Sequence, residues 1–111
     1  MYRIEFSFAK RGDIRYISHL DLMRLFMRAM RRAGLDLKLS EGFSPHPKLS
    51  IMRALKVGAE SDHEDAAVVL NSAIEAKDFV EALQRQLPQG ITVTGARCIR
   101  QGVSDAKRNT D

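Results

Sequence analysis

The densest group of side chains that can do chemistry lies in residues 43–50, which read FSPHPKLS. Each proline in this run fixes its own φ and biases the preceding residue toward extended geometry. We therefore expect Ser44, His46 and Lys48 to stand on a stiff, extended loop. Such a loop presents a hydroxyl, an imidazole and an ammonium group, and it loses little entropy when a ligand binds. The alternative is a rigid connector whose prolines only end the neighbouring elements.

A row of arginines at helical spacing forms the second candidate site. Arg24, Arg28 and Arg31 are four and three residues apart, so on a helix they share one face and spread over roughly 10 Å. Like charges four residues apart destabilise a helix by about 0.2–0.5 kcal/mol per pair. A bound polyanion would remove that repulsion and release counterions. The alternative is a solvated face whose arginine stems cover apolar surface.

His19 would occupy the first turn of the same helix. The helix dipole there disfavours an imidazolium, so a neutral ring is favoured at pH 7. Such a ring can accept a proton or donate a hydrogen bond near a bound phosphate, whereas the alternative is a histidine at the surface or at the core boundary. The residues that we predict to contact RNA are Arg24, Arg28, Arg31, His19, His46 and Lys48. The accompanying loop residues are Gly42, Phe43, Ser44, Pro45, Pro47 and Ser50.

A catalytic interpretation of these residues also exists. Groups such as Tyr16, His46 and Lys48 can cleave RNA without a metal, because one activates the 2′-hydroxyl and another protonates the leaving oxygen. These are common residues without a diagnostic spacing. We therefore assign no catalytic residue and keep RNA cleavage as an alternative.

The sequence shows no motif for a metal or a cofactor. Cys98 is the only cysteine, so the chain has no cysteine set for zinc or an iron–sulfur cluster. His63 lies among Glu60, Asp62, Glu64 and Asp65, but the spacing matches no EF-hand loop. We interpret residues 58–65 as a solvated acidic loop and expect no metal site and no cofactor in this chain.

Positive charge is concentrated in the first half of the chain. Residues 1–58 hold 12 Lys+Arg against 5 Asp+Glu, giving +7, and residues 59–111 hold 6 against 9, giving −3, which sum to +4. This asymmetry favours one face made for an anion, and nucleic acid is the commonest large one. No apolar run approaches the length of a membrane span, and Arg3 and Glu5 interrupt the apolar N-terminal segment, unlike a secretory signal. We expect a cytoplasmic protein without a membrane partner.

Hydrophobic periodicity predicts the elements that position these residues. We predict strands at 2–8, 35–40, 66–71 and 91–99, an extended segment at 49–57, a short extended link at 14–17, and helices at 18–33 and 77–87. Ser18 would cap the first helix and Gly34 would end it. Two βαβ-like halves on one antiparallel sheet, with both helices on one face, form a ferredoxin-like α+β sandwich. We expect one domain over residues 1–100 and a polar, frayed tail over 101–111.

Two long runs resemble a known family. ISHLDLMRLFMRAMRRAGL at 17–35 and SEGFSPHPKLS at 40–50 are similar to motifs of the radical SAM-linked protein family, a bacterial family of unassigned biochemistry. Its domains occur fused to, or encoded beside, radical SAM enzymes, often near genes for RNA processing and ribosome components. The resemblance implies a radical SAM enzyme and RNA as partners. It carries over no catalytic residue, because none is established for the family.

The chain departs from the family pattern in two ways. Ser44 stands where members commonly have asparagine. Members usually continue well past this chain's end, so residues 1–100 correspond either to a short member or to the N-terminal half of a longer domain. A site shared with a second half would then be incomplete in this chain.

These observations lead to three hypotheses. The first is an accessory, RNA-binding module that works with a radical SAM enzyme in RNA modification. The second is a protein-docking module for such an enzyme that makes no RNA contact. The third is a metal-free endoribonuclease that uses His46 or His19.

Overall fold

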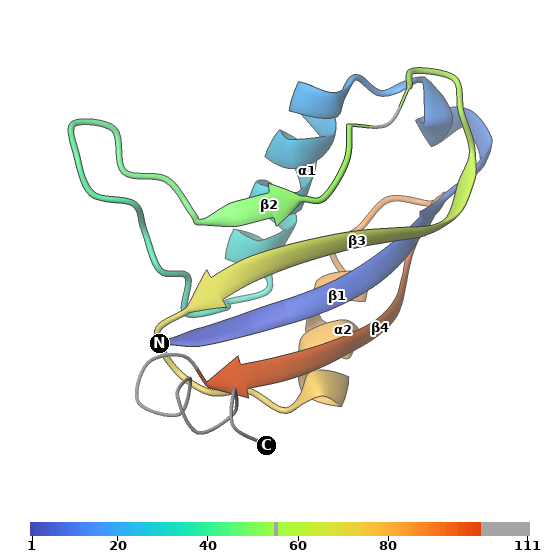
Figure 1. The fold of residues 1–111 in the computed structure, drawn as a ribbon. Helices are drawn as coiled ribbons and strands as arrows, with labels where there is room; N and C mark the ends of the chain where they lie inside the picture. Colours follow the sequence, from blue (N-terminus) through green and yellow to red (C-terminus); the bar gives the residue numbers. More distant parts are fainter. Residues whose placement is uncertain (55, 101–111) are drawn as a thin grey trace, which may run out of the picture.

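The computed structural model describes residues 1–54 and 56–100, and Figure 1 shows a four-stranded sheet with two helices behind it. The strands are antiparallel and lie in the order β2-β3-β1-β4. This is the expected ferredoxin-like α+β sandwich, and the tail predicted at 101–111 lies outside the described residues. The elements are β1 (Tyr2–Lys10), the 3-10 helix η1 (Gly12–Tyr16), α1 (His19–Arg32), β2 (Leu49–Ile51), β3 (Ser61–Leu70), α2 (Ala76–Gln84) and β4 (Ile91–Arg100).

The core lies between the sheet and the two helices. Phe6 and Phe8 of β1 are buried, as the alternation in the sequence predicts. The ring of Phe26 in α1 lies 5.7 Å from that of Phe6 and 4.9 Å from that of Phe8, and the ring of Phe79 in α2 lies 5.5 Å from Phe6. Each such aromatic pair adds about 0.5–1.5 kcal/mol beyond its area burial. The cluster therefore fixes both helices against one face of the sheet.

Helix α1 begins and ends where the sequence predicts. The backbone N–H of Asp21 donates to the Ser18 side-chain oxygen at 3.1 Å, which satisfies one of the free donors at the helix start. Gly34 follows the helix with φ of 75°, a conformation that glycine adopts without strain. The buried residues of α1 are Leu22, Phe26, Ala29 and Met30. No helix within residues 1–54 and 56–100 is long and apolar enough to cross a membrane.

The strand predicted at residues 35–40 is wrong. Only two isolated bridges form there, Leu37 with Leu70 and Leu39 with Pro47. Leu35 and Leu37 still pack against the core, which explains the alternating pattern, but their backbone has no continuous strand to pair with. The second strand of the sheet is β2 instead, which occupies the start of the extended segment predicted at 49–57.

Two further segments differ from the prediction. Residues 61–65 form the first half of β3 and not a loop, because their charges find partners: Asp62 pairs with Arg11, and Glu64 pairs with Arg53. The link at 14–17 is not extended. Most of it lies in η1, and the backbone N–H of Ile17 donates to the carbonyl oxygen of Ile14 at 3.0 Å.

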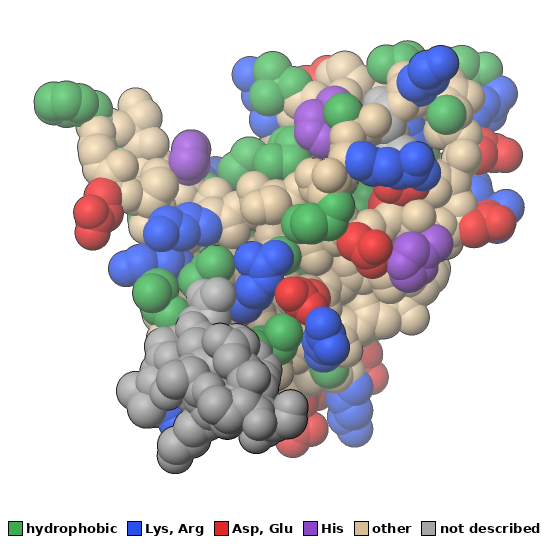
Figure 2. Space-filling model, viewed as in Figure 1, with side chains coloured by type: hydrophobic (Ala, Val, Ile, Leu, Met, Phe, Trp, Pro, Cys, Tyr) green, Lys and Arg blue, Asp and Glu red, His purple; other side chains and the backbone are tan. Residues whose placement is uncertain are grey.

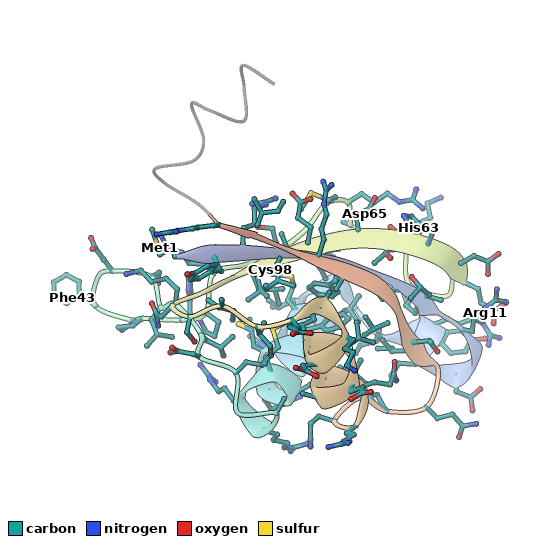
Figure 3. The ribbon with its side chains drawn as sticks, turned by 90° about the horizontal axis from the view of Figure 1, so that it is seen from below. Met1, Arg11, Phe43, His63, Asp65 and Cys98 are labelled. Atoms are coloured by element: carbon teal, nitrogen blue, oxygen red, sulfur yellow. The ribbon has the colours of Figure 1, made fainter. Side chains whose placement is uncertain are left out.

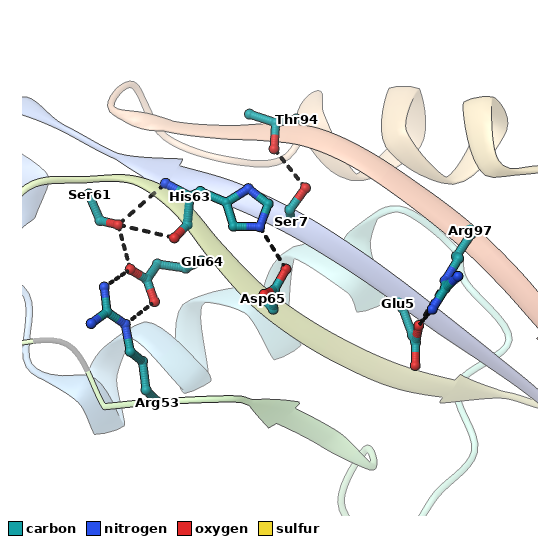
Figure 4. A network of polar contacts seen from close by, with 9 residues as sticks. All are labelled: Glu5, Ser7, Arg53, Ser61, His63, Glu64, Asp65, Thr94 and Arg97. Carbon is teal, nitrogen blue, oxygen red and sulfur yellow. Dashed lines mark hydrogen bonds and ion pairs between the residues drawn. The ribbon is translucent and has the colours of Figure 1, made fainter.

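A group of buried charges closes the end of the sheet beside η1. The ammonium group of Lys10 is buried and donates to the carbonyl oxygens of Arg15 at 3.3 Å and Lys56 at 3.5 Å. Figure 4 shows Glu64, which is 2% exposed, accepting two bonds from Arg53 at 2.8 and 2.6 Å and one from Ser61. The bonds from Arg53 lower the pKa of Glu64, and burial lowers the pKa of Lys10. These charges therefore tie η1 and the 52–60 segment to the sheet.

Arg53→Met is expected to destabilise the protein by about 1–3 kcal/mol at pH 7, because it leaves the buried Glu64 carboxylate without its main donor. In the wild type, the pKa of Glu64 lies below its ordinary value of 4.5. Its contribution to stability is therefore complete above that value and is lost as the pH falls through the folded-state pKa. Urea denaturation from pH 7 to pH 3 should show the gap between wild type and variant shrinking in acid.

Arg97→Met is the matched control, because it removes a partner from the half-buried Glu5. We expect Arg97→Met to lower the free energy of unfolding by less than Arg53→Met does. A gap between the wild type and Arg53→Met that stays constant down to pH 3 would contradict this account of Glu64.

Candidate nucleic-acid interface

A groove runs between α1 and the segment that follows α2. Its volume is about 540 Å³. Three guanidinium-bearing residues line it, Arg28 and Arg32 from α1 and Arg85 at the end of α2. The remaining lining residues are Leu25, Ala29, Gln86, Leu87 and Pro88. We call this feature the arginine groove.

The three side chains of the arginine groove are unpaired. Within the described residues, none of Arg28, Arg32 and Arg85 makes a side-chain hydrogen bond or an ion pair. Two of them have a local reason to be arginine, because Arg32 lies in the last turn of α1 and Arg85 caps α2, where the helix dipole favours a cation. Arg28 lies earlier in α1 and has no such compensation. The groove therefore gathers positive charge that the fold itself does not neutralise.

The predicted row of three arginines lies on α1, and one of its members lines the groove. Arg24, Arg28 and Arg31 are all exposed on α1, but only Arg28 lines the groove. Arg24 makes a long, exposed ion pair with Asp21 at 3.4 Å. Two groove residues were missed. Arg32 lies outside the predicted row, and no pattern within one helix shows that Arg85 of another helix lies beside it.

The second feature is a hairpin formed by residues 38–48, which we call the proline hairpin. The backbone N–H of Ser40 donates to the carbonyl oxygen of His46 at 2.8 Å, and that of Lys48 donates to Lys38 at 3.2 Å. Figure 1 shows this segment extending beyond the edge of the sheet, and Figure 3 shows Phe43 at its tip pointing away from the body. The pairing joins the two arms on either side of the tip, at Ser40 with His46 and at Lys38 with Lys48.

The base of the proline hairpin is fixed to the end of β3. The backbone N–H of Lys38 donates to the carbonyl oxygen of Val69 at 2.9 Å, and the N–H of Val69 donates to that of Lys48 at 3.1 Å. Pro47 is buried. His46 is exposed, and its Nδ1 lies 3.0 Å from the hydroxyl oxygen of Ser40. Both arms of the hairpin are thus held where they leave the sheet.

Tyr16 and His19 do not join the proline hairpin. The hairpin base lies beside Leu70, which pairs with Tyr2 at one end of β1, whereas η1 follows Lys10 at the other end. The nine residues of β1 separate these ends by roughly 26 Å. The cleavage set of Tyr16, His46 and Lys48 is therefore not assembled.

His19 lies at the start of α1, twelve residues before Arg31, and so roughly 18 Å from it along the helix axis. Its Nδ1 is buried and has no hydrogen-bond partner among the described residues. His19 does not line the arginine groove, and neither does any residue of the proline hairpin. The single surface expected from the sequence is thus divided between separate elements.

The open face of the sheet is electrostatically balanced. Figure 2 views this face and shows Lys, Arg, Asp and Glu interspersed over it. Glu5 accepts from Arg97 at 2.6 Å and from Arg3 at 3.1 Å, and these bonds lower its pKa. His63 lies 3.0 Å from Asp65. The open face of the sheet has a hollow of about 520 Å³, and several of these paired groups line it. This face therefore offers a polyanion less unpaired charge than the arginine groove does.

Comparison with known proteins places the chain in a family. A family model described as an uncharacterized protein conserved in bacteria, DUF2344, matches residues 3–111. The chain belongs to this family. No curated protein matches the chain. The family description names no activity, so a functional proposal depends on the geometry described above and on the sequence runs at 17–35 and 40–50.

Arg28→Gln is expected to stabilise the protein at low salt by about 0.6–1.5 kcal/mol, because each of three like-charged pairs on adjacent helical turns costs about 0.2–0.5 kcal/mol. Arg28 has such neighbours at Arg24, Arg31 and Arg32. Screening should remove most of the gain at 0.5 M NaCl. Urea denaturation of the wild type and of Arg28→Gln at 0.02 and 0.5 M NaCl measures the difference in free energy of unfolding at each salt concentration.

Arg24→Gln is the control. It also removes the ion pair with Asp21, so its free energy of unfolding at low salt should rise by less than that of Arg28→Gln. A loss of stability in Arg28→Gln at low salt would show instead that this guanidinium group supports the fold.

Proposed function

We propose that this member of the DUF2344 family is an accessory RNA-binding module that works in the cytoplasm with a radical SAM enzyme in RNA modification. The observation that supports RNA binding is the set of three guanidinium groups in the arginine groove, which have no side-chain partner among the described residues. The radical SAM part depends on the resemblance of residues 17–35 and 40–50 to the radical SAM-linked family. That enzyme would supply the iron–sulfur chemistry, since Cys98 is the only cysteine of this chain.

Phosphate is the ligand that the arginine groove suits best. A guanidinium group offers a planar fork of donors that matches two phosphate oxygens, and such charge-assisted bonds are about twice as strong as neutral ones. Within residues 1–54 and 56–100, no protein group uses the side-chain donors of Arg28, Arg32 and Arg85. A phosphate between them would also remove their mutual repulsion.

A polyanion explains more of the surface than one small anion does. Arg24 and Arg31 continue the positive charge along α1 on either side of Arg28 and lie outside the groove. A chain of phosphates can contact these residues and the groove together and can release several counterions. The excess of +7 over residues 1–58 favours the same class of ligand.

The triple variant Arg28→Gln/Arg32→Gln/Arg85→Gln is expected to bind an RNA stem-loop more weakly than the wild type. Each phosphate contact contributes about 0.7–0.9 to the slope of log K against log salt, so losing three contacts should reduce that slope by about 2–3. Fluorescence anisotropy at four NaCl concentrations measures the affinity and the slope.

The matched control is Arg11→Gln/Lys56→Gln/Lys77→Gln, which removes the same charge from exposed positions outside the groove. We expect it to keep most of the affinity. Equal losses in both triple variants, or an affinity that does not change with salt, would refute the arginine groove as the RNA site. Co-purification of the tagged chain with a radical SAM enzyme from its own cells tests the partner separately.

A further inference from the structure

The tip of the proline hairpin presents a single aromatic ring to solvent. Phe43 has a relative exposure of 108%, so no described residue covers it. The other aromatic side chain with a large exposed fraction is Tyr16, which stacks with the guanidinium group of Arg15 at 4.4 Å. Figure 2 shows the hairpin standing clear of the body with a hydrophobic side chain at its end. Phe43 is thus an apolar ring that the described residues leave exposed to solvent.

The hairpin fixes the two arms that carry this ring. Its arms pair through Ser40 and His46, and through Lys38 and Lys48. The Ser40 hydroxyl also accepts from the backbone N–H of His46 at 3.2 Å. A ring on a braced arm loses little conformational freedom when a ligand covers it.

The charged side chains of the hairpin around Phe43 are mostly basic. Lys38 and Lys48 lie opposite each other at the hairpin base, and His46 is exposed between them and the tip. Glu41 is the one acidic residue of the hairpin. Protein–protein interface cores are depleted in lysine, serine and glutamate, whereas single-stranded nucleic acid is bound by aromatic rings for the bases and cations for the phosphates.

We infer that Phe43 stacks on an unpaired base of RNA, with Lys38 and Lys48 beside the neighbouring phosphates. This inference rests on the proposed function and adds the substrate class, which is RNA with a single-stranded segment. A base within a duplex has both faces covered by its neighbours, so the ring cannot reach it, whereas a base in a loop or a bulge is accessible. The arginine groove would hold phosphates of the same RNA without reading its bases.

Phe43→Trp provides a direct probe, because the chain has no tryptophan and indole fluorescence reports stacking on a base. Titration with a single-stranded 12-nucleotide RNA should quench this fluorescence, and a 12-base-pair RNA duplex should quench it far less. Val57→Trp places the same probe on an exposed residue of the 52–60 segment, away from the hairpin, and should not respond to either RNA.

Affinities of two further variants test the ring itself. Phe43→Ala should weaken binding of the single strand by about 5- to 150-fold, the range found when one base–aromatic stack is removed. Phe43→Leu keeps apolar volume without an aromatic face, so it should be nearly as weak as Phe43→Ala. The duplex should bind all variants alike.

Several outcomes would overturn the inference. If Phe43→Leu binds the single strand as well as the wild type, or if Phe43→Trp is not quenched, the ring does not stack on a base, although the arginine groove can still bind RNA. If Phe43→Ala binds RNA normally but no longer retains the partner enzyme, the hairpin is a protein contact. If the wild type binds no RNA at low salt, both this inference and the proposed function fail.

Discussion

The burial of one face of α1 is the constraint on which the rest of the surface depends. Phe26 and Met30 lie within the core at 0% exposure, and the helical period then leaves the opposite face to solvent. Arg28 and Arg32 lie on adjacent turns at the edge of that exposed face. The helix cannot rotate to bury them without removing Phe26 and Met30 from the core. The ferredoxin-like arrangement adds Arg85 by placing the end of α2 beside them. Hydrophobic packing thus concentrates unpaired positive charge in one groove.

A second constraint determines where the proline hairpin projects from the sheet. After α1 the chain continues into residues 35–37, of which Leu35 and Leu37 pack on the core. The backbone of Lys38 and of Lys48 then forms hydrogen bonds with Val69 near the end of β3. Because both arms are fixed there, the residues between them must project from the sheet edge. The protein therefore presents the arginine groove on its helical side and an aromatic ring on a projecting arm. An RNA with both phosphates and unpaired bases would use both features, as we propose.

Much of this architecture is predictable from local pattern, and the remainder depends on contacts distant in sequence. Period-two alternation identifies β1, and the Ser18 cap with the Gly34 terminus bounds α1, because these signals are set by neighbouring residues. The pattern LDLKLS has the same alternation, yet its backbone pairs with a loop and a strand end, which no local rule shows. Likewise, Glu64 looks solvated among acidic residues until Arg53 is placed against it. Arg85 joins the arginine groove only through the packing of two helices.

The most direct test of RNA recognition is to map contacts residue by residue. Titration of the ¹⁵N-labelled chain with a single-stranded RNA, followed by heteronuclear NMR, should shift the side-chain Nε–H signals of Arg28, Arg32 and Arg85 and the backbone signals of residues 41–48. The signals of Arg3 and Arg97 on the open sheet face should stay unchanged. Shifts confined to that open face, or the absence of any shift at low salt, would contradict the account.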